Sequence, residues 1–379
     1  MTSQIITQLE TPALLLERGR MQKNIARMRD QFVRLKVGFR PHVKTAKCVE
    51  VALAMSGGSP GPITVSTLRE ADYFADHGFT DILYAVGITP NKMVHVAALL
   101  KRGVRLTVIL DSLDAAHALV QAAAAMPFAV NALIEIDCDG HRAGILPESA
   151  DLLAVADILA KGGVIVAGVV THAGGSYDCR SDEALRLMAE QERSRTVRAA
   201  ERLRQAGHAA PVVSVGSTPT ALFAQNLTGV TEVRAGVFVF FDLVMAGLGV
   251  CRVEDIALSV LTTVIGHQRE KGWTIVDAGW MAMSRDRGTA TQPVDQGFGL
   301  VCDANGAALP DYILVSANQE HGIIAHRNGA EGKPLDIPIG AQLRILPNHA
   351  CATGAQHARY HVLNGTCAVV DAWERIGGW

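Results

Sequence analysis

The chain has 379 residues, of which 49% are hydrophobic and 19% are charged, a composition typical of a globular protein with a large core. Its 35 basic and 37 acidic residues leave a formal net charge of −2, so we expect neither nucleic acid nor a membrane surface as a partner. Seven scattered cysteines without a C-x-x-C pair favour a reducing cytoplasm, and the N-terminal stretch MTSQIITQLETPALLLERGR predicts no signal peptide.

Short β-branched segments alternate with helical patterns as far as about residue 245. Eight strands are expected here, at Val37–Pro41, Pro62–Ser66, Ile82–Val86, Arg105–Leu110, Val130–Asp137, Val164–Thr171, Val212–Gly216 and Thr231–Gly236. Good helix formers fill the segments between them, most clearly at Leu68–His77 and Glu183–Ala206. Because no dinucleotide glycine fingerprint follows the first strand, the pattern predicts a (β/α)8 barrel, with an open doubly wound sheet as the alternative.

The remaining chain contains strand patterns and turns with hardly any helix. The expected strands are Leu258–His267, Trp273–Asp277, Tyr312–Ser316, Leu343–Leu346 and Cys367–Trp373, with Thr11–Leu16 joining them from the N-terminal side. We therefore expect an α/β barrel over residues 15–245 and a second, mainly antiparallel β domain over residues 1–14 and 246–379.

The segment RPHVKTAK, residues 40–47, directly follows the first predicted strand. A strand that ends near Pro41 delivers His42 and Lys44 to its carboxyl end, where barrels of this kind gather their functional groups. Lys44 is therefore a candidate catalytic residue, and a solvated surface lysine is the alternative. Lys47 lies where the next helix is expected to begin, so we expect it to be solvated.

The turn VGSTPT, residues 215–220, follows the seventh predicted strand. Gly216 allows a close approach of the backbone to a ligand, and Ser217 and Thr218 add hydroxyl donors to backbone N–H groups. The loops after the seventh and eighth strands are the usual phosphate site of such barrels, although an ordinary serine–threonine turn has the same sequence. A phosphate site and an amine on one rim suit pyridoxal 5′-phosphate, with Lys44 as the Schiff-base lysine.

The segment LPNHACATGAQH, residues 346–357, contains a candidate metal-binding pair. His349 and Cys351 are two residues apart, so on an extended chain both side chains would point to the same face. Imidazole and thiolate together suit a borderline-soft divalent metal, while a hydrogen-bonded histidine beside a buried thiol is the alternative. His357 and His361 are four apart, but strand-like sequence around His361 argues against a helical metal pair.

A set of motifs from about residue 11 to the C-terminus resembles the fold-type III pyridoxal phosphate enzymes, the alanine racemase-like group. Within that group the chain is similar to the metal-dependent D-serine dehydratase and D-threonine aldolase branch. The motifs are RPHVKTAK, ITVSTLREA, EIDCDGHRAG, THAGGSY, VVSVGSTPTAL, TEVRAGVFVFFDLVM, IVDAGWMAMSRDRGTA, NQEHGI and LPNHACATGAQ.

The resemblance implies a role for particular residues at the cofactor. The cofactor-binding residues it implies are Lys44, Arg142, His172, Tyr177, Gly216, Ser217, Thr218 and Arg234. Arg142 would approach the phenolic oxygen, His172 would lie beside the pyridine ring, and Tyr177 would join the phosphate turn. Arg234 occupies the position where racemases place an arginine against the pyridine nitrogen, and a salt bridge inside the barrel is the alternative. His349 and Cys351 would bind a divalent metal, namely zinc, manganese, cobalt or nickel.

One departure from the racemases bears on the reaction. Racemases carry a tyrosine where this chain has Trp280, and tryptophan cannot act as an acid or base, so two-base racemisation is disfavoured. The resemblance implies instead a dehydratase that eliminates the β-hydroxyl of a D-3-hydroxy amino acid. The expected substrate is D-threo-3-hydroxyaspartate, giving oxaloacetate and ammonia, with D-serine giving pyruvate as a further reaction. Arg285 or Arg287 would bind a β-carboxylate, and a surface ion pair is the alternative.

Two other functions fit the same residues. D-threonine-type aldol cleavage on this scaffold would give glycine and an aldehyde. A non-catalytic pyridoxal phosphate carrier is the other alternative, but such a carrier would need neither the long β domain nor the His-x-Cys pair. The resemblance also implies a homodimer.

Overall fold

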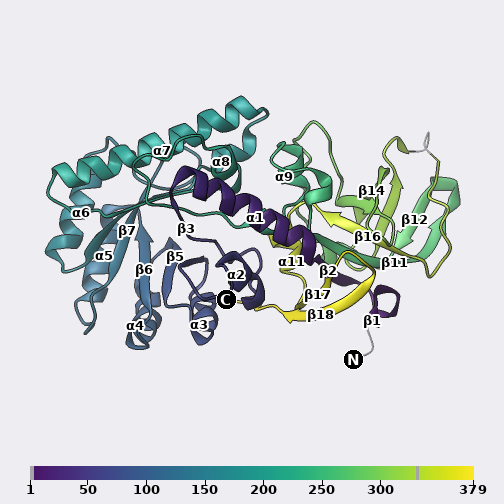
Figure 1. The fold of residues 1–379 in the computed structure, drawn as a ribbon, viewed down its shortest axis with the longest axis horizontal. Coiled ribbons are helices and arrows are strands. Elements are labelled where there is room, and N and C mark those ends of the chain that lie inside the picture. The colour runs from purple at the N-terminus through teal and green to yellow at the C-terminus, as the bar shows by residue number, and fades with distance from the viewer. Residues whose placement is uncertain (1–3, 330–332) are drawn as a thin grey trace. The chain divides into compact units, whose positions relative to one another are not determined.

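The computed structural model describes residues 4–329 and 333–379. By its internal contacts the chain divides into two compact units. The barrel unit comprises Arg27–Gly236 and Gly378–Trp379, and the β unit comprises Met1–Ala26 and Val237–Gly377. Helix α1 (Arg18–Leu35) contains the first of the points at which the chain passes from one unit to the other, between Ala26 and Arg27 (Figure 1).

Eight parallel strands form the sheet of the barrel unit. In chain order they are β3 (Gly38–Phe39), β4 (Ile63–Val65), β5 (Asp81–Gly87), β6 (Arg105–Leu110), β7 (Asn131–Ile136), β8 (Ile165–Thr171), β9 (Val212–Val215) and β10 (Glu232–Val233). Their spatial order is β3-β10-β9-β8-β7-β6-β5-β4. A parallel bridge between His42 and Thr64 joins the two ends of this order, with the Thr64 N–H donating to the Pro41 carbonyl at 2.9 Å. The sheet is therefore closed, which confirms the predicted barrel over the open sheet.

Helices follow most of these strands and pack around them (Figure 1). They are α2 (Val49–Met55), α3 (Leu68–Asp76), α4 (Met93–Lys101), α5 (Leu113–Ala123), α6 (Asp151–Lys161), α7 (Asp182–Gln205) and α8 (Thr218–Phe223). Hydroxyl side chains determine where several begin, because each accepts a hydrogen bond from a backbone N–H of the first turn. Thr67 caps α3, Ser112 caps α5 and Ser181 caps α7 in this way.

The barrel strands contribute both an apolar cluster and a network of charged side chains. Buried Leu83, Ile109, Leu133 and Val170 form a cluster contributed by β5 to β8. Arg40, which follows β3, donates to Glu232 of β10 at 2.9 Å and to Asp81 of β5 at 2.7 Å. A buried ion is tolerated only when it is paired, so this arrangement explains how charged residues can lie inside a closed sheet.

The β unit contains a ten-stranded sheet. Its strands are β1 (Gln4–Ile5), β2 (Ala13–Glu17), β11 (Leu258–Gln268), β12 (Trp273–Val276), β13 (Gly299–Cys302), β14 (Ala308–Ala317), β15 (Gly322–His326), β16 (Gln342–Pro347), β17 (Arg359–Leu363) and β18 (Ala368–Glu374). The order is β1-β18-β17-β2-β11-β12-β15-β14-β13-β16, and β16 also pairs with β11, which closes strands β11 to β16 into a barrel. Every pair is antiparallel except β2 with β17, as predicted for a mainly antiparallel domain.

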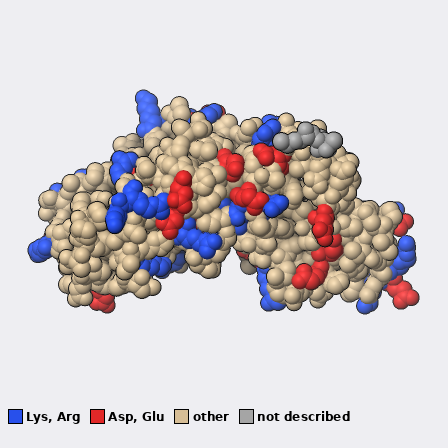
Figure 2. Space-filling view, turned by 90° about the horizontal axis from the view of Figure 1, so that it is seen from below, with Lys and Arg blue, Asp and Glu red and all other residues tan. Residues whose placement is uncertain are grey.

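Short helical segments connect these strands. The α-helices are α9 (Leu243–Gly247), α10 (Trp280–Met283) and α11 (Ala350–Gly354). Single 3-10 turns occur in both units, at Ile6–Gln8, Pro90–Lys92, Gly174–Asp178, Val237–Val239, Val253–Asp255 and Arg269–Lys271. Among the described helices, none combines the length and the apolarity needed to cross a bilayer. Acidic and basic side chains interleave over the face drawn in Figure 2.

Candidate active-site residues in the two units

A cluster of basic side chains lies at the carboxyl ends of the barrel strands. It consists of His42 and Lys44 after β3, Arg142 after β7, His172 after β8 and Arg234 after β10, and we call it the basic cluster. Burial and the charges of Lys44 and Arg234 hold the pKa of His42 well below its usual value. Burial, again with Lys44 and Arg234, lowers the pKa of His172 to about 3. Both imidazoles are therefore neutral at pH 7.

Two hydrogen bonds orient these imidazoles. The Nδ1 of His172 donates to the Gly216 carbonyl at 2.9 Å, which assigns the ring proton to Nδ1 and ties the loop after β8 to that after β9. The Nδ1 of His42 accepts from the Lys44 backbone N–H at 3.4 Å. The Lys44 side chain itself is exposed. Lys44 therefore projects from a turn whose backbone is fixed.

Arg234 is 5% exposed, yet it makes no salt bridge. Its Nε donates to the Ser214 hydroxyl at 2.9 Å, and its Nη2 donates to the Thr171 carbonyl. Within residues 4–329 and 333–379, no carboxylate lies within ion-pair distance of this guanidinium. The alternative of an ordinary internal salt bridge is therefore wrong. Arg142 is more exposed and pairs with Glu135 at 3.3 Å.

The GST turn is a densely hydrogen-bonded helix start. The Ser217 hydroxyl lies 2.9 Å from both the Ser176 and the Thr220 hydroxyls and accepts from the Thr220 N–H, which caps α8. Gly216 has a φ of +141°, and a Cβ there would lie 1.9 Å from the Arg234 carbonyl oxygen. Close packing against β10 therefore requires this glycine, a reason additional to the predicted approach of a ligand. The Tyr177 ring lies 6.4 Å from the His172 ring.

Glu192 of α7 is a buried carboxylate that the sequence reading did not identify. Only 2% of it is exposed, and its Oε1 accepts from the Ala173 N–H at 2.9 Å and from the Gly216 N–H at 3.1 Å. These two N–H groups belong to the loops after β8 and β9, so one carboxylate joins both loops. Burial raises the pKa of Glu192. On a helix rich in Glu and Arg, no local pattern distinguishes it from a solvated residue.

We expect Glu192→Ala to destabilise the protein by on the order of 3 kcal/mol, because two buried N–H groups lose their acceptor. Glu192→Gln keeps an acceptor oxygen and is expected to be tolerated. In the wild type the folded carboxyl binds its proton more tightly than the unfolded one, so the free energy of unfolding falls as pH rises above about 4.5. The Gln variant lacks this fall, and urea unfolding between pH 4 and pH 8 measures the difference.

Glu190→Gln is the matched control for that experiment. Glu190 lies on the same helix and pairs with Arg193, with a side chain 49% exposed. Its hydrogen bond to Arg193 lowers its pKa, so its contribution to stability is lost as pH falls, the opposite dependence. Equal pH slopes for wild type and Glu192→Gln would contradict the assignment of Glu192.

The β unit contains the predicted metal-binding pair. His349 is the N-cap residue of α11, and Cys351 lies in the first turn of that helix. The expected extended geometry is therefore wrong, and the helix start brings the two side chains together instead. The His349 Nδ1 donates to the Asp286 Oδ2 at 2.6 Å. Burial lowers the pKa of His349, but hydrogen bonds to Asp286 and Cys351 outweigh it and raise that pKa to about 11.

Buried polar side chains hold the backbone on both sides of His349. The Asp242 Oδ2 accepts from the Ala350 N–H at 3.0 Å, and burial raises the pKa of this carboxyl. The Asn348 Nδ2 donates to the Asp286 carbonyl at 3.1 Å and to the Gly297 carbonyl at 2.7 Å. Because these contacts join residues far apart in the chain, sequence patterns did not indicate them.

The other histidines of this segment do not join the pair. The His357 Nε2 donates to the Ala282 carbonyl at 2.9 Å, and His361 belongs to strand β17, which confirms that they form no helical pair. Across the described part of the chain, no cluster of three or more His, Cys, Asp or Glu side chains is arranged for a metal. His349 and Cys351 therefore offer two protein ligands.

The two arginines of MSRDRG differ in their partners. Arg287 pairs with Asp295 at 2.7 Å and lies over the Phe298 ring at 5.0 Å. Arg285 lies over the Trp280 ring at 4.2 Å, and no carboxylate of the described residues is within ion-pair distance of it. The surface ion pair considered for both arginines is thus found for Arg287, and Arg285 is the one whose charge has no acidic partner.

Lys47 is not solvated, contrary to expectation. Its Nζ lies 3.1 Å from the buried Glu70 carboxylate and 5.5 Å from the centre of the Trp379 ring, and its side chain is 14% exposed. The sequence did not indicate that the Glu70 carboxylate would pair with Lys47. Of the two lysines in RPHVKTAK, Lys47 is therefore held in a structural ion pair and Lys44 is exposed.

Known family models and relatives match this chain over most of its length. The alanine racemase N-terminal domain model matches residues 16–244, and a serine dehydratase domain model matches residues 257–363. D-threo-3-hydroxyaspartate dehydratase from a Delftia strain is 54% identical over 98% of both chains. D-serine dehydratase from Dictyostelium discoideum is 30% identical over 99% of this chain and 98% of its own.

Solved structures agree with these matches. The structure of the Delftia dehydratase has a TM-score of 0.95 at 53% identity and covers 99% of this chain and 100% of its own. A mutant D-threo-3-hydroxyaspartate dehydratase in its metal-free form has a TM-score of 0.96 at 52% identity and covers 99% of this chain and 100% of its own.

Proposed function

This chain belongs to the alanine racemase-like family, in the branch of the D-serine and D-threo-3-hydroxyaspartate dehydratases, and we propose that it is a lyase acting on D-3-hydroxy amino acids. It eliminates the β-hydroxyl of D-threo-3-hydroxyaspartate, giving oxaloacetate and ammonia, and converts D-serine to pyruvate more slowly. The observation that carries this proposal is 54% identity to one such dehydratase over 98% of both chains.

The basic cluster suits pyridoxal 5′-phosphate. Burial, together with the charges of Lys44 and Arg234, keeps the pKa values of His42 and His172 low, so both imidazoles are neutral. The cationic side chains of the cluster supply the positive charge that an anionic phosphate and phenolate require. The residues that would hold the cofactor are Lys44, Arg142, His172, Tyr177, Gly216, Ser217, Thr218 and Arg234. When bound, this cofactor takes up the electron pair left at a substrate carbon that loses its proton.

The protein residues supply proton transfer and orientation. Lys44 Nζ removes the proton from the substrate α-carbon and holds it, as an amine on a fixed turn can. Arg234 donates hydrogen bonds without giving up its proton, so beside the pyridine nitrogen of a bound cofactor it would leave that nitrogen unprotonated and the electron sink weaker. Departure of the β-hydroxyl then needs help from another group.

The residue pair in the β unit suits a divalent metal. Asp286 accepts from the Nδ1 of His349, so an ion would take the place of the proton on Nε2, an arrangement common around metal-binding histidines. The Cys351 thiolate is the other ligand, and zinc, manganese, cobalt or nickel would suit this donor set. Such an ion supplies Lewis acidity for departure of the hydroxyl group.

Product analysis tests the proposal. The purified enzyme is incubated with D-threo-3-hydroxyaspartate, D-serine and D-threonine, with and without added metal, and the products are quantified. Ammonia with a 2-oxo acid supports elimination. Glycine with an aldehyde would establish the aldolase alternative, and absence of turnover with all three would favour a pyridoxal phosphate carrier.

The proposal also includes the domain boundaries, the oligomeric state and the cellular location. The cofactor domain spans residues 15–245, and the domain with the metal pair spans residues 1–14 and 246–379. The enzyme works as a homodimer, which light scattering would test. None of the seven cysteines forms a disulfide with another, which supports a reducing cytoplasm as the location.

We expect Arg285→Gln to lower kcat/KM for D-threo-3-hydroxyaspartate about 10- to 100-fold, because a charge-assisted pair with the β-carboxylate is lost. D-serine has no β-carboxylate, so its kcat/KM is expected to change little. Arg287→Gln is the control, since that guanidinium already pairs with Asp295. Equal losses for both substrates would show that Arg285 does not select the β-carboxylate.

A further inference from the structure

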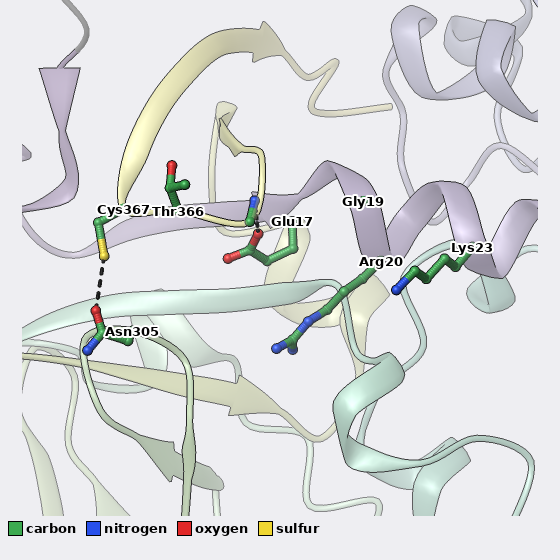
Figure 3. Close-up of a pocket in the computed structure, with 8 residues that line it drawn as sticks. Glu17, Gly19, Arg20, Lys23, Asn305, Thr366 and Cys367 are labelled. Atoms are coloured by element: carbon green, nitrogen blue, oxygen red, sulfur yellow. Dashed lines mark hydrogen bonds between the residues drawn. The ribbon is translucent and has the colours of Figure 1, made fainter.

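The β unit contains a cavity whose lining residues take no part in the sites described above. Its volume is about 370 Å³, and its lining includes Glu17 at the end of β2, Arg20 and Lys23 in the first turns of α1, and Asn305. Residues 365–367, between β17 and β18, complete the wall. Figure 3 shows the Arg20 and Lys23 side chains extending from α1 toward the side of the cavity where Glu17 lies.

Arg20 and Lys23 contribute positive charge to one side of the cavity. They are three residues apart on a helix, so their side chains share a face. The Arg20 Nη1 donates to the Ile256 carbonyl at 3.0 Å, which fixes the guanidinium in place. Across the described residues, no carboxylate lies within ion-pair distance of Arg20 or Lys23.

The one carboxylate in the lining is already paired. Glu17 accepts from the Arg344 Nη1 at 2.8 Å, and both side chains are largely buried, at 14% and 3% exposed. Its other oxygen accepts from the Gly365 N–H at 3.3 Å. Arg344 therefore balances the charge of Glu17, and the charges of Arg20 and Lys23 remain available to a ligand.

Neutral groups in the wall add donors. The Cys367 thiol donates to the Asn305 Oδ1 at 3.3 Å, which orients the amide and leaves its Nδ2 as a donor. The Thr366 hydroxyl accepts from the Ala368 N–H at 3.2 Å and keeps its own proton to donate. Two cations, an amide N–H and a hydroxyl form a donor set for an anion, and the set contains no uncompensated acid.

We propose that this cavity binds a small organic dianion, either a phosphate monoester or a dicarboxylate. The two positive side chains match a charge of −2, and the volume lies within the range of small-molecule sites, larger than one inorganic ion requires. Charge-assisted hydrogen bonds from the fixed Arg20 guanidinium and the exposed ammonium of Lys23 would supply most of the affinity. The site is independent of the proposed reaction.

The test is calorimetric titration of the holoenzyme with glycerol 3-phosphate, succinate and inorganic phosphate. We expect saturable binding of at least one organic dianion, weakening as salt is raised. Lys23→Gln should lower the affinity about tenfold, and Arg20→Gln by as much or more. Lys23 is exposed, so its variant remains informative even if loss of the Arg20 bond to Ile256 impairs folding.

Arg29→Gln is the matched control, because Arg29 lies on the same helix outside the cavity and is 65% exposed. The affinity of the Arg29→Gln variant for the dianion should equal that of the wild type. Binding of glycerol 3-phosphate alone or succinate alone would identify which dianion the cavity takes. The proposal is wrong if no organic dianion binds at millimolar concentration, or if Lys23→Gln and Arg29→Gln bind equally well. Turnover of Lys23→Gln and Arg29→Gln should be unchanged, which separates failure of this proposal from failure of the proposed function.

Discussion

Lys44→Arg is expected to lower kcat by about 10³-fold or more, because a guanidinium cannot act as the amine nucleophile or as a general base near neutral pH. The substitution keeps a positive charge beside His42 and His172, so their pKa values should stay low. The purified variant should also lose its visible absorbance, and borohydride should no longer fix a cofactor to residue 44. Absorbance spectroscopy and peptide mapping measure both effects.

Comparison of Lys44→Ala with Lys44→Arg separates the effect of losing the positive charge from the effect of losing the amine nucleophile. It removes the amine and the charge together, so the pKa of His172 is expected to rise toward its ordinary value, since Lys44 is one of the groups that lower it. Lys47→Arg is the matched control, because it preserves the ion pair with Glu70 and leaves the exposed lysine untouched. Lys47→Arg should keep its absorbance and turnover. If borohydride fixes the cofactor to residue 47 of the wild type, the assignment of Lys44 as the Schiff-base lysine is wrong.

Much of the barrel could be predicted because its strands are buried on both sides and read as apolar runs. The segment Arg105–Leu110 has the bounds expected from sequence. Helix α3 differs from expectation by one residue at its C-terminal end, and α7 by one residue at each end. Closure of the sheet could not be predicted. It depends on the single bridge between His42 and Thr64, and no periodicity in the sequence reports a pairing of that kind.

The β unit was predicted less completely for a different reason. Strands β13, β15 and β17 are four or five residues long, and two of them begin with glycine, so their patterns are too short to distinguish from turns. The helix α11 has five residues, and the sequence around it was read as extended. The sequence analysis paired His349 with Cys351 because both side chains would share one face of an extended chain. The structure brings the two side chains together at the start of a helix instead.

Among the candidate site residues, those with a local sequence pattern could be predicted, and those that depend on distant partners could not. Lys44 could be predicted because it follows a strand at the functional end of a barrel, whereas His172 and Arg234 were predicted only through the family resemblance. Glu192 and Asp286 could not, because their partners are remote in sequence and partly backbone groups. The Asp286–His349 contact spans 63 residues, so only the folded chain reveals which carboxylate orients that imidazole.

Cys351→Ser is expected to lower bound metal and turnover together, because a hydroxyl is a far weaker ligand than a thiolate for a borderline-soft ion. Metal analysis of the purified protein and kcat measured in the same preparation test this. The visible absorbance of the cofactor should persist, since the residues that would hold it belong to the barrel unit. Cys367→Ser is the control, a partly exposed cysteine of the same unit whose thiol donates to Asn305.

Asp286→Asn distinguishes a residue that orients the metal ligand from a ligand itself. The amide can still accept from the His349 Nδ1, but it lacks the charge that makes this imidazole a strong donor, so metal affinity should fall about 10- to 100-fold. Excess metal should then restore turnover to Asp286→Asn, and it should restore far less to Cys351→Ser. If Cys351→Ser keeps full metal content and full kcat after treatment with a chelator, the pair binds no catalytic metal, and loss of the β-hydroxyl must be assisted by another group.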